Sequence, residues 1–266
     1  MIHPTAVVSS KATLGEGVEV APFAVIEDDV VIGDGCRIGP HSHITGHTTI
    51  GKNTKIFTGA VIGDEPQDYH YKGEVSYTDI GDDCIIREYV TIHRGAQPES
   101  RTVIGNHVML MALGHVAHNC VIGDNVIIAN SALLAGHVEI DDRAVLSGGV
   151  AVHQFARIGT LAMISGLARV TQDVPPYCML SEDVVHGPNV IGLKRAGISP
   201  ESRRAIREAI KIFFLQGLNR PNAVEKIRQE LSGIPEVDIF LEFVSDTRRG
   251  YMPGRARKDI GNGGQE

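Results

Sequence analysis

Tryptophan is absent from this sequence, and aromatic residues make up only 5% of it. Large aromatic side chains supply much of the buried volume of an ordinary globular core. Their scarcity, together with 30 glycines, favours a thin core built from aliphatic side chains. The sequence also lacks any run of about 18 apolar residues, so it predicts no membrane-spanning helix.

The most informative pattern is an aliphatic residue that returns every six positions, in one frame, from Ile2 to Val170. Neither the helical period of about 3.6 nor the strand period of two produces this spacing. A short fixed period is typical of a solenoid, in which successive units stack and share one core. The frame is interrupted only within residues 63–79 and 95–102, which we interpret as loops inserted between coils. Three units would form a triangular coil whose short parallel strands lie about 4.8 Å from those of the next coil.

Cysteine is rare, with four residues in the chain. Cys36, Cys84 and Cys120 each lie two positions before an aliphatic frame residue, where the other residues are mostly small or β-branched. Small buried side chains explain this placement better than disulfides or a zinc cluster. The N-terminus does not resemble a signal peptide. We therefore expect a soluble cytoplasmic protein.

The repeat ends near Val170, and residues 173–177 are interpreted as a cap and exit turn. Ser199 followed by Pro200 is typical of a helix start, and further helices are expected near 222–231 and 236–244. We expect a β-helix domain over residues 1–190 and an α-helical domain over 191–266, with a loose tail from Pro253.

Charge changes at the same boundary. Residues 1–193 carry 11 basic and 22 acidic side chains, whereas residues 194–259 carry 14 basic and nine acidic ones. Nucleic acid is a poor candidate partner because no aromatic stacking platform or binding motif accompanies the basic residues. An acidic protein is the better candidate, although ordinary solvated helix faces remain an alternative. The basic residues include Arg203, Arg204, Arg207, Arg220, Arg228, Arg248 and Arg249.

Polar residues that depart from the repeat are the candidates for chemistry. The first insertion contains Asp68, Tyr69, His70, Tyr71 and Lys72, a hydrogen-bonding set suited to a sugar or nucleotide. A coil of about 18 residues also places His118, Gly136 and Gln154 in one stack, with His137 over Asn119 and His153 over Ala135. His115 lies three residues before His118, so several imidazoles gather on one edge.

Two kinds of chemistry are open to these imidazoles. One histidine could act as a general base toward an attacking hydroxyl, oriented by Asn119 or a backbone carbonyl, with the Gly136 N–H as oxyanion donor. Alternatively, neutral imidazoles could hold a zinc ion.

At this point the chain resembles the UDP-N-acetylglucosamine acyltransferases, which begin lipid A synthesis. The resemblance covers the repeat, the insertion and the helical C-terminus. It is carried by residues 91–95 (TIHRG), 115–120 (HVAHNC), 134–137 (LAGH), 151–155 (AVHQF), 172–177 (QDVPPY) and 192–195 (GLKR). It implies a left-handed parallel β-helix, an exception to the usual right-handed crossover.

The resemblance further implies transfer of a 3-hydroxyacyl group from acyl carrier protein to the glucosamine 3-position of the UDP-sugar, with His118 as general base and Gly136 as oxyanion donor. It implies a homotrimer and no cofactor beyond the carrier's phosphopantetheine arm. Gly166 matches a position that limits acyl length, and the carrier would meet Arg203, Arg204, Arg207, Arg248 and Arg249. The implied substrate contacts are Asp68, His70, His115, His137, His153, Gln154, Asn189 and Arg195.

Three departures from the family pattern bear on the acceptor sugar. Asn119 replaces an Asp, His70 replaces a Lys, and Leu113 replaces a common Asn. A 3-amino analogue of the UDP-sugar is therefore an alternative acceptor. A γ-type carbonic anhydrase is a second alternative, but its paired histidines are typically five residues apart. A third is the N-acyltransferase that acts later in the pathway, but it normally carries an extra N-terminal domain, whereas this repeat begins at Ile2.

Overall fold

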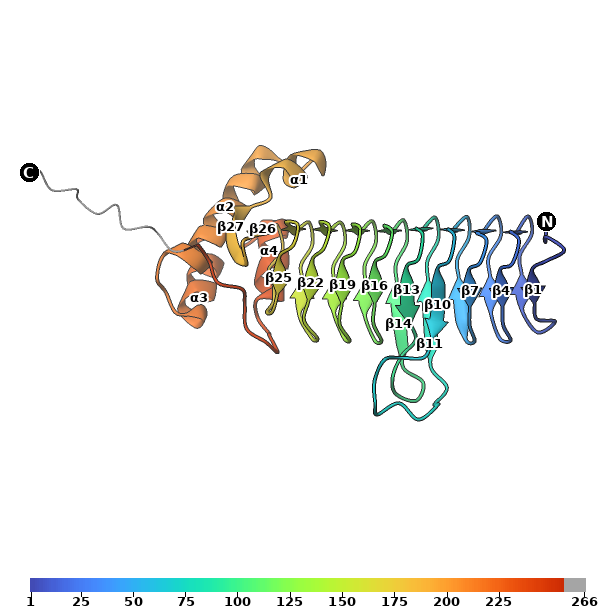
Figure 1. Cartoon of the computed structure of the whole chain (residues 1–266). Helices are drawn as coiled ribbons and strands as arrows, with labels where there is room; N and C mark the ends of the chain where they lie inside the picture. The colour runs from blue at the N-terminus through green and yellow to red at the C-terminus, as the bar shows by residue number, and fades with distance from the viewer. Residues whose placement is uncertain (256–266) are drawn as a thin grey trace, which may run out of the picture.

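The computed structural model describes residues 1–255, and it is a long prism of stacked coils with helices at its C-terminal end (Figure 1). Each coil contributes one short strand to each of three parallel sheets. The predicted class, a parallel β-helix with a small helical C-terminal part, is confirmed.

The first sheet runs along one face of the prism. It consists of β1 (Val7–Val8), β4 (Val25–Ile26), β7 (His43–Ile44), β10 (Val61–Asp64), β13 (Thr91–His93), β16 (His115–Val116), β19 (Leu133–Leu134), β22 (Ala151–Val152) and β25 (Arg169–Val170). The second consists of β2 (Thr13–Leu14), β5 (Val31–Ile32), β8 (Thr48–Ile50), β11 (Tyr77–Ile80), β14 (Arg101–Ile104), β17 (Val121–Ile122), β20 (Glu139–Ile140) and β23 (Arg157–Ile158).

The third sheet adds a final hairpin to the repeat. It consists of β3 (Glu19–Val20), β6 (Arg37–Ile38), β9 (Lys55–Ile56), β12 (Ile85–Ile86), β15 (Met109–Leu110), β18 (Ile127–Ile128), β21 (Val145–Leu146), β24 (Met163–Ile164), β26 (Cys178–Ser181) and β27 (Val184–Pro188). Because β26 pairs in parallel with β24, the solenoid continues past Val170. The six-residue period does end at Val170, but the interpretation of residues 173–177 as an exit turn is wrong, because they belong to one more coil.

The core is a column of aliphatic frame residues. Ile44, Ile92 and Leu134 are fully buried, as are the small residues two positions earlier. All four cysteines are buried and free. The Cys120 thiol donates to the Ala135 carbonyl oxygen at 3.2 Å, and burial raises its pKa to about 12. The interpretation of the cysteines as small core residues is therefore confirmed.

The corner between the second and third sheets explains why glycine follows most frame residues of the second sheet. There the carboxylate or amide oxygen of an Asp or Asn accepts a hydrogen bond from a backbone N–H in the preceding coil. Asp124, for example, accepts from the Asn106 N–H at 2.7 Å, and these repeated bonds form a ladder along the corner. A Cβ on Gly105 would lie 2.8 Å from the carbonyl carbon of Gly123. Glycine thus lets successive coils approach closely enough for this ladder to form.

Four helices follow the hairpin: α1 (Val190–Arg195), α2 (Pro200–Leu215), α3 (Arg220–Leu231) and α4 (Pro235–Phe243). Ser199 caps α2 as expected, by accepting the Ser202 N–H at 3.0 Å. The helix α1 was not anticipated, and α3 begins two residues before the expected start. Among the described residues, no helix is long and apolar enough to cross a membrane.

The expected loose tail is wrong for residues 253–255. The Val185 N–H donates to the Pro253 carbonyl oxygen at 2.8 Å, and the Arg255 N–H donates to the Val185 carbonyl oxygen at 3.0 Å. These bonds pair residues 253–255 with β27. The remainder of the expected tail, residues 256–266, lies outside the described residues.

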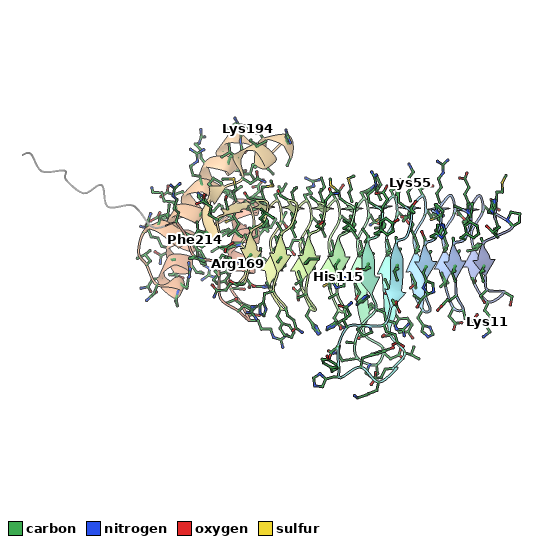
Figure 2. All side chains as sticks on the ribbon, in the orientation of Figure 1. Lys11, Lys55, His115, Arg169, Lys194 and Phe214 are labelled. Carbon is green, nitrogen blue, oxygen red and sulfur yellow. The ribbon has the colours of Figure 1, made fainter. Side chains whose placement is uncertain are left out.

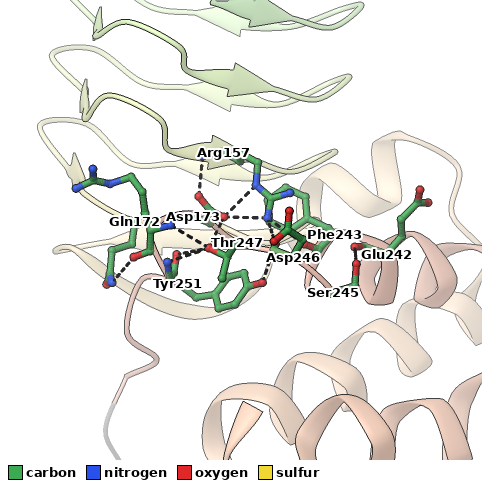
Figure 3. A network of polar contacts seen from close by, with 11 residues as sticks. Arg157, Gln172, Asp173, Glu242, Phe243, Ser245, Asp246, Thr247 and Tyr251 are labelled. Carbon is green, nitrogen blue, oxygen red and sulfur yellow. Dashed lines mark hydrogen bonds and ion pairs between the residues drawn. The ribbon is translucent and has the colours of Figure 1, made fainter. Parts of the chain in front are cut away.

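A buried ion pair joins the last coils to the helical part (Figure 3). The Arg157 guanidinium donates to the fully buried Asp173 carboxylate at 2.9 and 3.0 Å. It also donates to the carbonyl oxygens of Phe243 and Asp246. The Thr247 hydroxyl donates to Asp173 at 2.8 Å. The segment that follows α4 is thereby fixed against the edge of the β-helix.

The close approach at Gly105 predicts an effect on stability. We expect Gly105→Ala to lower the free energy of unfolding by about 1–3 kcal/mol because the new methyl group overpacks a backbone contact. Urea unfolding at one fixed protein concentration would measure the change. Gly46→Ala is the control, because its Cβ would lie 3.5 Å from the nearest atom; an equal loss in both variants would contradict this explanation.

Candidate active site

His118 lies at the corner between the first and second sheets, and its side chain is 9% exposed. Its Nδ1 lies 2.9 Å from Asn119 Oδ1, and the same oxygen accepts the Ala96 N–H at 3.0 Å. A backbone N–H can only donate, so this Asn119 atom is the carbonyl oxygen and Nδ1 must carry a hydrogen. Neutral His118 therefore keeps its free lone pair on Nε2, which suits a general base.

Gly136 lies directly over the His118 ring in the next coil. A Cβ at this position would be 2.5 Å from His118 Cε1, so only glycine leaves room for the imidazole. Within residues 1–255, the Gly136 N–H donates to no protein acceptor. The Asp and Asn side chains that accept backbone N–H groups at the corner between the second and third sheets have no counterpart at Gly136. This arrangement leaves a backbone donor free beside the base.

Asp68 is brought to the site by the loop between β10 and β11. Its Oδ2 lies 3.9 Å from His118 Nε2. The His70 N–H donates to Asp68 Oδ1 at 2.9 Å and the His70 ring lies 3.0 Å from the same oxygen; these bonds, the backbone one first, lower the Asp68 pKa. The His70 side chain itself is 96% exposed. His70 therefore holds Asp68 and extends into solvent.

Two further histidines lie on the first sheet near His118: His115 in the same coil and His93 in the coil before it. Figure 2 shows His115 midway along the prism, and its Nδ1 lies 2.7 Å from Thr91 Oγ1. Its ring meets His93 edge-on, with centroids 4.9 Å apart. Burial and the neighbouring His118 lower the pKa of His115. Burial lowers the pKa of His93 to about 4, and its buried Nδ1 has no hydrogen-bond partner.

His137 lies beside His118, at the same corner in the next coil. Its ring meets His118 edge-on at 5.3 Å and stacks on Phe155 at 4.9 Å. The Arg248 guanidinium covers Phe155 at 4.4 Å. Asn119 and His137 both adopt positive φ, 61° and 58°, which turns these corner side chains outward. Burial, then His118 and Arg248, lower the pKa of His137.

A groove of about 770 Å³ runs over the first sheet beside these residues. His115, His118, Gly136 and Gln154, four of the predicted site residues, line it. Sequence reasoning did not assign its apolar side, which is formed by Leu133 and Ala151 at outward strand positions and by Leu113 in the turn before β16. It also missed Gln67, next to Asp68. The groove combines a base, a free N–H and an apolar floor, which suits attack on an acyl group.

Comparisons with known proteins agree with this chemistry. A sequence model described as UDP N-acetylglucosamine O-acyltransferase, domain 2, matches residues 173–252, and one for bacterial transferase hexapeptide repeats matches residues 29–64 and 101–136. The chain is 46% identical to an acyl-[acyl-carrier-protein]–UDP-N-acetylglucosamine O-acyltransferase of Halorhodospira halophila, over 94% of this chain and 98% of the relative. It is 48% identical to the protein of the same name from Trichlorobacter lovleyi, over 95% and 99%.

Solved structures of UDP-N-acetylglucosamine acyltransferases are also similar to this chain. The UDP-N-acetylglucosamine acyltransferase of Bacteroides fragilis superposes with a TM-score of 0.93 at 42% identity, covering 95% of this chain and all of the other. The chain belongs to the UDP-N-acetylglucosamine O-acyltransferase family. The enzyme class and the left-handed β-helix implied by the resemblance are thereby confirmed, and the carbonic anhydrase alternative is not supported.

Several residues predicted to belong to the site lie outside the groove that contains His118 in a single chain. Asn189 caps α1: its Oδ1 accepts the Gly192 N–H at 3.0 Å and its Nδ2 donates to the Leu161 carbonyl oxygen at 2.9 Å. His153 and Arg195 are exposed. Gly166 lies at the corner between the third and first sheets, where a Cβ would meet only ordinary contacts. The structure does not bring these residues to His118.

The basic residues of this acyltransferase divide into two groups. Arg203, Arg204 and Arg207 line a hollow of about 270 Å³ between α1 and α2. Arg248 instead covers Phe155, and the Arg249 guanidinium donates to the Thr171 carbonyl oxygen at 2.8 Å. The first group shares one surface of α2, whereas Arg248 and Arg249 contact residues of the β-helix. In the described part of the chain, no three His, Cys, Asp or Glu residues are grouped so as to hold a metal ion.

The lowered pKa of His93 predicts a pH dependence of stability. Between pH 6.5 and about 4, the unfolded chain binds a proton that folded His93 excludes, so stability falls as pH falls through this window. The expected contribution of His93 is about 2–3 kcal/mol. Urea unfolding at pH 7 and 4.5 would show a smaller difference for His93→Gln than for wild type. An unchanged difference would contradict the assignment.

Proposed function

We propose that this protein transfers a 3-hydroxyacyl chain from acyl carrier protein to the glucosamine 3-hydroxyl of UDP-N-acetylglucosamine, the first step of lipid A biosynthesis. Membership of the family supports the substrates. The observation that carries the mechanism is His118, whose Nδ1 hydrogen is bonded to Asn119 and whose Nε2 faces the groove beside Gly136. The same proposal includes a cytoplasmic location.

In the proposed reaction, Nε2 of His118 takes the proton of the sugar hydroxyl while its oxygen attacks the thioester carbonyl carbon. The imidazolium formed is stabilised by the Asp68 carboxylate, 3.9 Å away. The tetrahedral intermediate places a negative charge on the former carbonyl oxygen, and the free Gly136 N–H donates to it. Collapse breaks the carbon–sulfur bond, and the imidazolium returns the proton to the departing phosphopantetheine thiolate.

The donor would approach along the basic face of α2. Acyl carrier protein is the acidic partner expected from the charge distribution, and Arg203, Arg204 and Arg207 offer it a cationic cluster in which Arg204 and Arg207 are exposed. The phosphopantetheine arm arrives with the carrier, so no resident cofactor is required.

A homotrimer with sites between neighbouring copies is part of the proposal. The third sheet presents partly exposed apolar side chains at outward positions: Ile85, Met109, Ile127, Val145 and Met163. Apolar residues in this number on one solvent-facing strip are typical of an interface. A neighbouring copy would also supply contacts that Gly166, His153, Asn189 and Arg195 do not make within one chain.

A second candidate acceptor is the 3-amino analogue of the same UDP-sugar. The lining of the groove, as far as the structure describes it, contains no Lys or Arg, and Asp68 is its nearest carboxylate. A groove without a fixed cation tolerates an ammonium group on the substrate better than a groove lined by Lys or Arg would. Turnover measured with both purified sugars tests the alternative, which fails if only the 3-hydroxyl compound reacts.

We expect His118→Ala to lower kcat for acyl transfer to UDP-N-acetylglucosamine by about 100-fold or more. Transfer of a radiolabelled 3-hydroxyacyl group from its carrier protein would measure it. Retention of most activity would remove His118 from the mechanism without affecting the family assignment, whereas an inactive wild type would overturn the proposed substrates.

Asn119 provides a prediction about orientation. Asn119→Ala should lower kcat by about 10-fold to 100-fold, because nothing would then fix the Nδ1 hydrogen. Asn119→Asp is the matched control, since its carboxylate can still accept from both His118 and Ala96 and should retain or raise activity. Equal losses in the two variants would show that orientation is not the role of this side chain.

A further inference from the structure

The loop that carries Asp68 is braced on the β-helix by one arginine. The Arg94 side chain is only 15% exposed, and its Nε and Nη2 donate to the Tyr71 hydroxyl at 3.1 and 3.0 Å. That hydroxyl donates in turn to the Glu74 carbonyl oxygen at 2.9 Å. The loop, which projects from the prism below β10 and β11 (Figure 1), is thus tied to the coils at the Tyr71 hydroxyl, and Arg94 also lies 3.5 Å from Glu65 of the same loop.

Arg94 itself belongs to the column that carries the base. Thr91 pairs with His115 in adjacent strands, so Arg94 lies one coil below His118. Its N–H donates to the Asp64 carbonyl oxygen at 3.1 Å, where the loop begins. Its Nη1 lies 3.4 Å from both Thr45 Oγ1 and the Gly63 carbonyl oxygen. The coil that supports His118 therefore also fixes the origin of the loop.

We propose that Tyr71 and Arg94 are positioning residues that hold the Asp68 carboxylate against Nε2 of His118. The inference rests on the proposed function, because the Arg94–Tyr71 contact, here called the strut, would hold Asp68 near the positive charge that forms on His118 during transfer. Asn119 is neutral, so Asp68 is the carboxylate closest to the imidazolium. A flexible loop would leave that carboxylate unrestrained, whereas the Arg94–Tyr71 contact fixes the separation seen here.

A double-mutant cycle tests this role. Tyr71→Phe removes only the hydroxyl, and Arg94→Lys keeps the charge but cannot donate the paired bonds. We expect each to lower kcat about 10-fold with a smaller change in KM for UDP-N-acetylglucosamine. In an Asp68→Asn background the same changes should cost little further activity. Equal losses in both backgrounds, or no loss in the wild-type background, would overturn the proposal.

Tyr77→Phe is the matched control. Tyr77 stands at the other end of the same loop, its hydroxyl donates to Glu99 Oε2 at 3.0 Å, and Arg101 covers its ring. It directs no residue toward His118. A merely structural role for Tyr71 would make both tyrosine variants lose thermal stability and activity alike, whereas positioning predicts a loss of kcat for Tyr71→Phe alone.

A second measurement separates failure of this inference from failure of the proposed function. In protein with 15N-labelled histidine, the His118 ring signals can be assigned by their loss in His118→Ala. Asp68→Asn and Tyr71→Phe should shift these signals in the same direction, while Tyr77→Phe leaves them in place. This result requires no substrate. A His118 signal that responds to Asp68→Asn but not to Tyr71→Phe would overturn the strut even in an inactive enzyme.

Discussion

The structure depends on backbone hydrogen bonds between coils that repeat at a fixed register. Each strand is only a few residues long, and it is stabilised by the equivalent strands of the coils above and below it. The register places residues from distant parts of the sequence in columns along the prism, so a functional site can be assembled from one residue of each successive coil. Arg94, His118, Gly136 and Gln154 form such a column. The site is therefore as rigid as the prism, except where the loop before β11 leaves it.

Much of this architecture could be predicted because a period of six residues indicates a solenoid of short parallel strands, although its hand was implied only by the family resemblance. The stack of His118 under Gly136 followed from counting coils, and the helix beginning after Ser199 followed from a capping residue and a proline. The frame also identified both insertions. The last coil was missed because Val174 and Leu180 depart from the six-residue frame after Val170. The short helix α1 has too few residues for its periodicity to be recognised.

Side-chain direction could not be obtained from the period. His70 and Asp68 are close in sequence, yet one extends into solvent and the other approaches His118, because loop conformation sets both. Asn189 matched a substrate-binding position, but its amide groups are committed to α1 and to Leu161. Tyr71 was placed in the hydrogen-bonding set of the first insertion and His93 in the block 91–95, but nothing in the sequence indicated the contact of Tyr71 with Arg94 or the burial of His93.

The buried cysteines have a practical consequence for studying this protein. All four thiols are enclosed by the prism, and those of Cys84 and Cys120 have pKa values raised by burial to about 11 and 12. Thiolate is the species that reacts with electrophiles, so the folded chain presents almost none at neutral pH. A thiol-reactive dye would consequently leave the native fold unlabelled and report the opening of coils. Cys36, Cys84, Cys120 and Cys178 are spaced along the prism, which makes each one a local probe of where unravelling starts.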